Sequence, residues 1–132
     1  MIYNGSSMKN NYFELDEFQN IYLEDSFVIN IQETKSDLTF NCDFVILENH
    51  KLYSEPKNDE QYCYLCGYIK FGNIGNIHWI KRDKNAFLND CYDNDYGNID
   101  IFYIDDKKYY LKGDWGEVII QSKNIELILF NE

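Results

Sequence analysis

Cys63 and Cys66 have the spacing of a metal-binding or redox motif. A structural zinc site needs two more ligands, usually a second close pair, but Cys42 and Cys91 stand alone in the sequence. A redox pair of this spacing opens a helix after a strand, whereas the pattern of residues 62–71 predicts a strand. Side chains alternate along a strand, so we expect Cys63 and Cys66 to lie on opposite faces as structural thiols.

No other residues form a recognisable catalytic constellation. His50 and His78 are the only histidines, and no nucleophile motif of the G-x-S-x-G kind accompanies them. Neither of the glycine-rich loops that hold phosphates is present. Carboxylates are plentiful, but nothing distinguishes a glycosidase pair from solvated surface acids. We therefore predict no catalytic site, no metal and no cofactor.

The acidic residues gather in two blocks that contain no Lys or Arg. The first block, residues 10–34, contains Glu14, Asp16, Glu17, Glu24, Asp25 and Glu33. The second block, residues 85–106, contains Asp90, Asp93, Asp95, Asp100, Asp105 and Asp106, with Tyr92, Tyr96, Phe102 and Tyr103 among them. Acids steer a basic partner and aromatic side chains anchor it. We therefore expect a partner-binding surface in the second block, with Glu14, Asp16 and Glu17 as a second contact. Its residues in the second block are Asp90, Tyr92, Asp93, Asp95, Tyr96, Asp100, Asp105 and Asp106.

Two other interpretations of these blocks stay open. Runs of charge are often only a solvated surface, with the aromatic side chains in the core. Asp90, Asp93 and Asp95, followed by Gly97, also supply oxygen ligands for calcium. An EF-hand loop, however, needs another order of acids and a closing Glu.

The whole chain is short and acidic. It has 132 residues and a formal net charge of −11. This charge argues against binding to nucleic acid or to anionic membranes, since both need clustered Lys and Arg. No apolar run approaches the length that spans a bilayer and no signal peptide is evident, so we expect reduced cysteines in the cytoplasm. We expect a flexible segment at residues 1–10 and one β-rich domain at 11–132.

The elements that would position these residues are mainly strands. Aromatic residues make up 17% of the chain, and a single Ala, Ala86, and a single Pro, Pro56, are present. The spacing of apolar residues predicts one short helix over 12–22. Strands are predicted at residues 26–32, 38–47, 62–71, 77–80, 99–104, 108–112, 118–121 and 125–130, with turns at 34–37, 72–75, 105–107 and 113–116. About eight antiparallel strands at this spacing predict a sandwich or a partly open barrel.

Two further functions follow from the same strands. A small-molecule site, binding or enzymatic, would use a cavity lined by Tyr62, Tyr64, Tyr68, His78 and Trp79. A structural or oligomerisation domain would instead pair its edge strands at residues 125–130. Trp115, between two glycines of a tight turn, is expected to cap the core.

Two segments and the overall type of the chain carry a resemblance. Residues 96–100 and 111–118 resemble short signatures of small bacterial β-domains. In size, acidity and β content the chain resembles the immunity proteins of bacterial toxin systems, such as those of contact-dependent growth inhibition. The resemblance implies a cytosolic protein that binds and blocks a basic toxin domain, often a nuclease. Acidic side chains would replace the substrate phosphates in the toxin's cleft.

If the second acidic block meets such a partner, then Asp93→Lys combined with Asp95→Lys weakens the complex and slows its association, because charge reversal removes electrostatic steering. Association kinetics of the wild-type and double-variant proteins with the partner measure this. An unchanged on-rate and affinity would show that the partner does not bind at this block.

Overall fold

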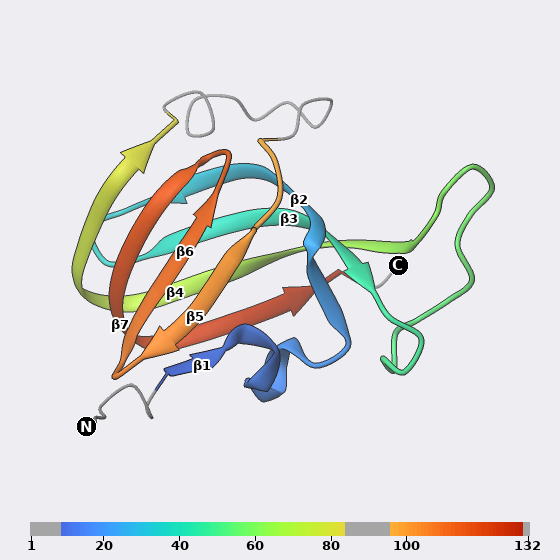
Figure 1. Ribbon diagram of the computed structural model, residues 1–132, viewed down its shortest axis with the longest axis horizontal. Helices are drawn as coiled ribbons and strands as arrows, with labels where there is room; N and C mark the ends of the chain where they lie inside the picture. Colours follow the sequence, from blue (N-terminus) through green and yellow to red (C-terminus); the bar gives the residue numbers. More distant parts are fainter. Residues whose placement is uncertain (1–8, 84–95, 131–132) are drawn as a thin grey trace, which may run out of the picture.

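The computed structural model describes residues 9–83 and 96–130, and in them seven strands form one antiparallel sheet. The order across the sheet is β1-β5-β6-β7-β4-β3-β2 (Figure 1). The strands are β1 (Lys9–Asn11), β2 (Ile21–Glu33), β3 (Leu38–Ile46), β4 (Cys63–Arg82), β5 (Ile101–Asp105), β6 (Lys108–Gly113) and β7 (Gly116–Leu129). The sheet folds over on itself without closing into a barrel, which confirms the predicted fold class.

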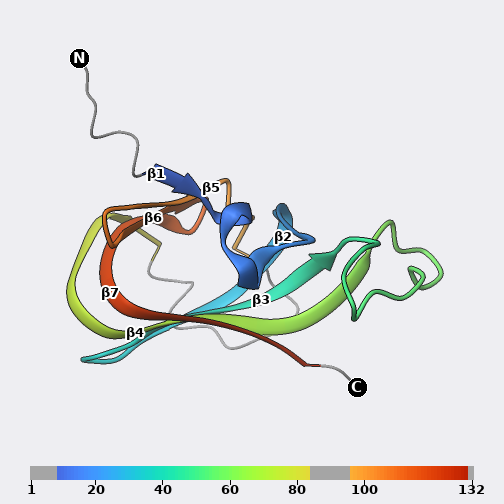
Figure 2. The same ribbon diagram turned by 90° about the horizontal axis from the view of Figure 1, so that it is seen from below.

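β4 and β7 are long because each unites two of the predicted strands. They pair with each other from Gly67 and Leu129 to Arg82 and Gly116. Figure 2 shows both strands curving from one layer of the sheet into the other. β3 pairs with the first half of β4, and β2 pairs with β3. β6 pairs with the first half of β7, and β5 and β1 follow it in the sheet.

The bend lies where the sequence predicts a hairpin turn, at residues 72–75, and that prediction is wrong. Asn73 has a φ of 50° and the register with β7 shifts between Ile74 and Asn76, which defines a bulge. The hydroxyl of Ser122, on β7, lies 2.5 Å from the carbonyl oxygen of Gly72 and is buried. Turn-forming residues here bend a strand without ending it.

The core lies between the two layers and is rich in aromatic rings. Phe40 on β3 meets Trp115 at 4.9 Å between ring centroids, and Phe71 on β4 meets Tyr109 on β6 at 5.1 Å. Trp115 is fully buried, as predicted, and its indole N–H donates to the carbonyl oxygen of Asn98 at 3.0 Å. Burial of such rings supplies the main apolar contact between the layers.

The predicted helix over residues 12–22 is absent. Two single turns of 3-10 helix, η2 (Tyr12–Glu14) and η3 (Asp16–Phe18), precede β2, which already begins at Ile21. The apolar spacing arises because Leu15, Phe18 and Ile21 pack in or against the core without a helix. Tyr12 and Phe18 both contact Phe102 there. Among the described residues no helix has the length and hydrophobicity needed to cross a membrane.

The other three predicted turns are confirmed. Thr34 and Asp37 close the β2–β3 hairpin, and Gly113 pairs with Gly116 across the β6–β7 hairpin. Asp106 and Lys107 both have positive φ in the two-residue turn between β5 and β6, as the twist of a tight hairpin requires.

The segment before β5 joins the two layers along the edge of β2. The amide of Tyr96 donates to Val28 O at 2.8 Å, and the amide of Val28 donates to Gly97 O at 2.9 Å. The side-chain amide of Asn98 donates to Ser26 O at 2.7 Å. One side of the folded sheet is therefore held by hydrogen bonds between this segment and the backbone of β2.

We expect Gly67→Ala to lower the free energy of unfolding by roughly 1–3 kcal/mol or more, as overpacking does. An added Cβ at Gly67 would lie 2.0 Å from Ile128 O, which is backbone of β7. The matched control is Gly75→Ala, where the nearest atom would lie 3.9 Å away. Urea unfolding of the three proteins measures this, and equal losses for both variants would contradict the close approach.

Candidate functional site at the open edge of β7

The structure separates the acids that the sequence assigns to a partner-binding surface. Asp100 lies before β5 and Asp106 in the turn after it, about 20 Å apart at the rise of an extended strand. Asp105 and Asp106 are exposed at that hairpin tip, whereas Tyr96 is half-buried against β2. Asp90, Tyr92, Asp93 and Asp95, with the possible calcium ligands among them, lie outside the described residues.

Asp100 shares its surroundings with other carboxylates. Partial burial raises its pKa, and the nearby charges of Asp114 and Glu24 raise it further. Glu24 also accepts a hydrogen bond from the hydroxyl of Tyr12, which is itself buried in the core. These acids come from three parts of the chain, so this grouping depends on the fold.

Glu14, Asp16 and Glu17 lie together in the two 3-10 turns. Glu14 accepts a hydrogen bond from the amide of Asn11 at 2.8 Å, and its side chain thus caps the first turn. Asp16 and Glu17 are exposed, and both line a groove beside the second half of β7. Of the predicted contacts, these two are the ones that the structure places beside a concave surface.

The second half of β7 has one unpaired edge within the described chain. Its partner on one side is β4, from Gly67 to Gly72, but β6 pairs with β7 only as far as Gln121. The amide of Phe130 donates to Cys66 O at 2.8 Å. Because backbone groups alternate along a strand, Ile128 and Glu126 also face β4.

The N–H and C=O groups of Ile125, Leu127 and Leu129 therefore point away from β4, toward the open edge. The register over these residues is regular, so the alternation holds along the whole stretch. Their side chains are half-buried and pack against the core. An edge of this kind combines unpaired backbone groups with apolar side chains, which is what an added strand needs.

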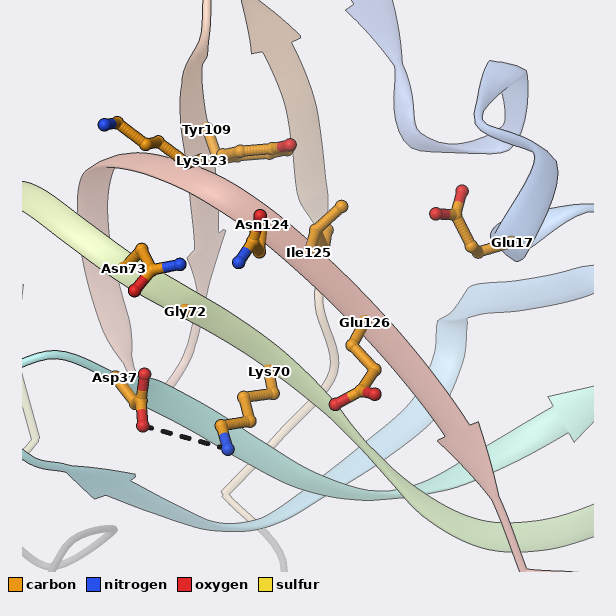
Figure 3. Close-up of a pocket in the computed structure, with 10 residues that line it drawn as sticks. All are labelled: Glu17, Asp37, Lys70, Gly72, Asn73, Tyr109, Lys123, Asn124, Ile125 and Glu126. Atoms are coloured by element: carbon orange, nitrogen blue, oxygen red, sulfur yellow. Dashed lines mark ion pairs between the residues drawn. The ribbon is translucent and has the colours of Figure 1, made fainter.

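Two hollows lie along this edge, and we call them together the β7 groove. The first has a volume of about 670 Å³ and the second about 370 Å³, within the range of roughly 300–1,000 Å³ of ligand clefts. Figure 3 shows the first hollow, with Glu17 facing Ile125 across it and Lys70 paired with Asp37 at 3.8 Å on the far side. The second hollow is lined by Asp16, Glu17 and Gln19, by residues 50–52 and by residues 127–129.

The groove has a polar rim and a tyrosine in its floor. Tyr109 and Glu17 both line the first hollow. Burial raises the pKa of Tyr109, and the charge of Glu17 raises it further. Glu126 and Lys123 are exposed on β7 itself. The groove thus presents exposed acids from two elements, η3 and β7, together with the exposed side chains of Lys51 and Lys123.

The cavity predicted from the tyrosines is not formed. Tyr62 directly precedes β4, and Tyr64 and Tyr68 lie on its first half. The ring of Tyr64 stacks on Phe27 with 5.8 Å between centroids, and the ring of Tyr68 meets Phe130 at 6.0 Å. The other two predicted residues lie beyond the bend, where His78 is exposed and Trp79 contacts Trp115. The five side chains therefore line no common cavity.

The cysteines take the places that the strand pattern predicts. Cys63 is buried and Cys66 is exposed, on opposite faces of β4, and Cys42 is fully buried. Burial raises the pKa of the Cys42 thiol far above its ordinary value, which keeps it protonated. In residues 9–83 and 96–130 no three His, Cys, Asp or Glu side chains lie together as metal ligands would.

Comparisons of the chain with protein-family models, with curated proteins and with solved structures return no match.

His50, in the wall of the groove, accepts a hydrogen bond on Nδ1 from the amide of Leu52 at 3.0 Å. Burial lowers the pKa of His50, and the charge of Lys51 lowers it further. The neutral form therefore stabilises the fold above the ordinary pKa of about 6.5, and this contribution is lost as the pH falls through the lowered value.

We expect His50→Gln to remove that pH dependence, so that the wild-type protein loses more stability than the variant between pH 7.5 and pH 5. Denaturant unfolding at the two pH values measures the difference. A wild-type His50 that titrates at or above about 6.5 in NMR spectra would contradict the lowered pKa.

Proposed function

We propose that this chain is a binding domain for a basic protein partner, in the manner of an immunity protein that occludes a toxin domain. The observation that carries the proposal is the position of Asp16 and Glu17 on the wall of the β7 groove. Both are exposed, and neither forms an ion pair with a described Lys or Arg. A cation of the partner would meet them without displacing an internal one.

The charge of the whole chain supports the same partner. The sequence has 23 acidic and 12 basic side chains, and between described residues two ion pairs form, Lys70 with Asp37 and Arg82 with Glu33. An excess of unpaired acids produces a negative potential that accelerates the approach of a positive surface. For a nuclease toxin, those acids would stand where the substrate phosphates bind.

Selection of linear peptides from a displayed random library tests the partner class directly. We expect the selected peptides to be enriched in Lys and Arg, and depleted in Asp and Glu, because like charges are repelled from the groove. Their binding should weaken as salt rises, since exposed charges are screened beyond about 10 Å at 0.1 M. Selected peptides without a basic bias, or with binding that salt does not change, would reject the proposal.

The double variant Asp16→Lys with Glu17→Lys should bind the selected peptides about tenfold more weakly, which corresponds to roughly 1.4 kcal/mol. The control is Asp59→Lys with Glu60→Lys, which makes the same change in net charge at two exposed positions that line neither hollow of the groove. Fluorescence polarisation titrations compare the two. An equal loss in both variants would show that net charge alone, and not the groove, governs binding.

A further inference from the structure

The open edge of β7 indicates how a segment of the partner would be bound, beyond the charge that the segment carries. Six backbone groups, the N–H and C=O of Ile125, Leu127 and Leu129, point into the β7 groove, as the alternation from the Phe130–Cys66 hydrogen bond requires. These groups have the spacing of one face of a ladder, and a peptide strand satisfies all of them together.

We propose that the partner contributes one extended segment, which adds to the sheet as a strand along the edge of β7 at residues 125–129. The inference rests on the proposed function only for the charge of the segment. The hydrogen bonding and the fit to the groove come from the geometry of the edge itself.

The walls of the groove favour a single strand over the edge of a second folded sheet. Asp16, Glu17 and Gln19 line the hollow beside residues 127–129 together with residues 50–52, and the amide of Leu47, which donates to Asn20 O at 2.9 Å, joins the two segments. A lone extended segment fits beside these side chains, whereas a folded sheet would bring neighbouring strands against them. The occupant is therefore a segment of a partner, and a second copy of this chain is the outcome that the test must exclude.

Side chains of the added strand alternate between two environments. On the inner face they lie beside the half-buried side chains of Ile125, Leu127 and Leu129, which favours aliphatic residues. On the other face they lie beside the exposed side chain of Glu126 and the half-buried side chain of Ile128, while Glu17 lies across the first hollow from Ile125. The segment that fits is one in which aliphatic residues alternate with Lys or Arg.

A first test needs no partner. In the free protein, the amides of Glu126 and Ile128 should exchange slowly with solvent deuterium because they bond to β4. Those of Ile125, Leu127 and Leu129 should exchange faster by at least tenfold because their edge is open. Equal protection of the two sets would show that the edge is already occupied, and would overturn the inference.

The second test uses a labelled nine-residue peptide, capped at both ends, in which valine alternates with lysine. We expect saturable binding, with slower exchange at the amides of Ile125, Leu127 and Leu129 in the complex. The same peptide with N-methyl groups on the backbone amides that face β7 should bind at least tenfold more weakly, since it cannot donate those bonds. Absence of saturable binding at millimolar peptide, or unchanged amide exchange in the complex, overturns the inference.

A pair of variants separates the backbone from the side chain. Leu127→Pro removes an N–H that faces the open edge, and proline is tolerated at such edge positions. Leu127→Ala loses the side chain but keeps the N–H. We expect the proline variant to bind the valine–lysine peptide at least fivefold more weakly than the alanine variant, with both checked for folding by circular dichroism. Equal affinities in two folded variants overturn the inference. If the proline variant does not fold, the comparison of the N-methylated peptide with the unmodified peptide replaces this test.

The charge and strand proposals can fail separately. If a valine–glutamate peptide binds as well as the valine–lysine peptide while N-methylation still prevents binding, strand addition holds and the basic partner is rejected. If the charge reversal at Asp16 and Glu17 weakens binding while N-methylation has no effect, the basic partner holds and strand addition is rejected. A dimer of the free wild-type protein that Leu127→Pro dissociates would assign the edge to a second copy and overturn the inference.

Discussion

Continuous pairing of β4 with β7 through the bend is the constraint on which the rest of the structure depends. β4 and β7 run through both layers of the folded sheet, and the two strands stay paired on both sides of the bulge. A 20-residue strand is longer than its neighbours, so each long strand has one half that its outer neighbour does not reach. β3 leaves the second half of β4 uncovered, and β6 leaves the second half of β7 uncovered.

These two uncovered halves differ in what lies beside them. The amide of Ile74 donates to Ser36 O, and Glu33 accepts a hydrogen bond from the indole of Trp79 at 3.2 Å and pairs with Arg82 at 3.2 Å. The edge of β4 is thus partly covered by the β2–β3 hairpin. Beside residues 125–129, η3 and residues 50–52 line a hollow, but in the described chain no strand pairs with that edge of β7.

The turns and the charge of this fold can be predicted from the sequence, but the edge cannot be fully predicted. Asp106-Lys107 and residues 113–116 form the predicted hairpins because local backbone preference decides a two-residue turn. Residues 72–75 contain similar turn-forming residues and yet form a bulge, because pairing with β7 outweighs local preference. The pattern at residues 125–130 predicts an edge strand, but which backbone groups are unpaired depends on the sheet order and on the register of residues far apart in sequence. Likewise, Asp16 and Glu17 are visible as acids in the sequence, but their place opposite Ile125 follows from packing of Phe18 against Phe102.

An open strand edge also exposes a protein to unwanted self-assembly, and Glu126 bears on that hazard. In a fibril, identical strands stack in register about 4.8 Å apart, so each Glu126 would lie directly above another with no counter-charge between them. The aliphatic residues on either side would otherwise favour such stacking. The carboxylate of Glu126 therefore favours an added strand of opposite charge and opposes the stacking of copies of this chain along the edge.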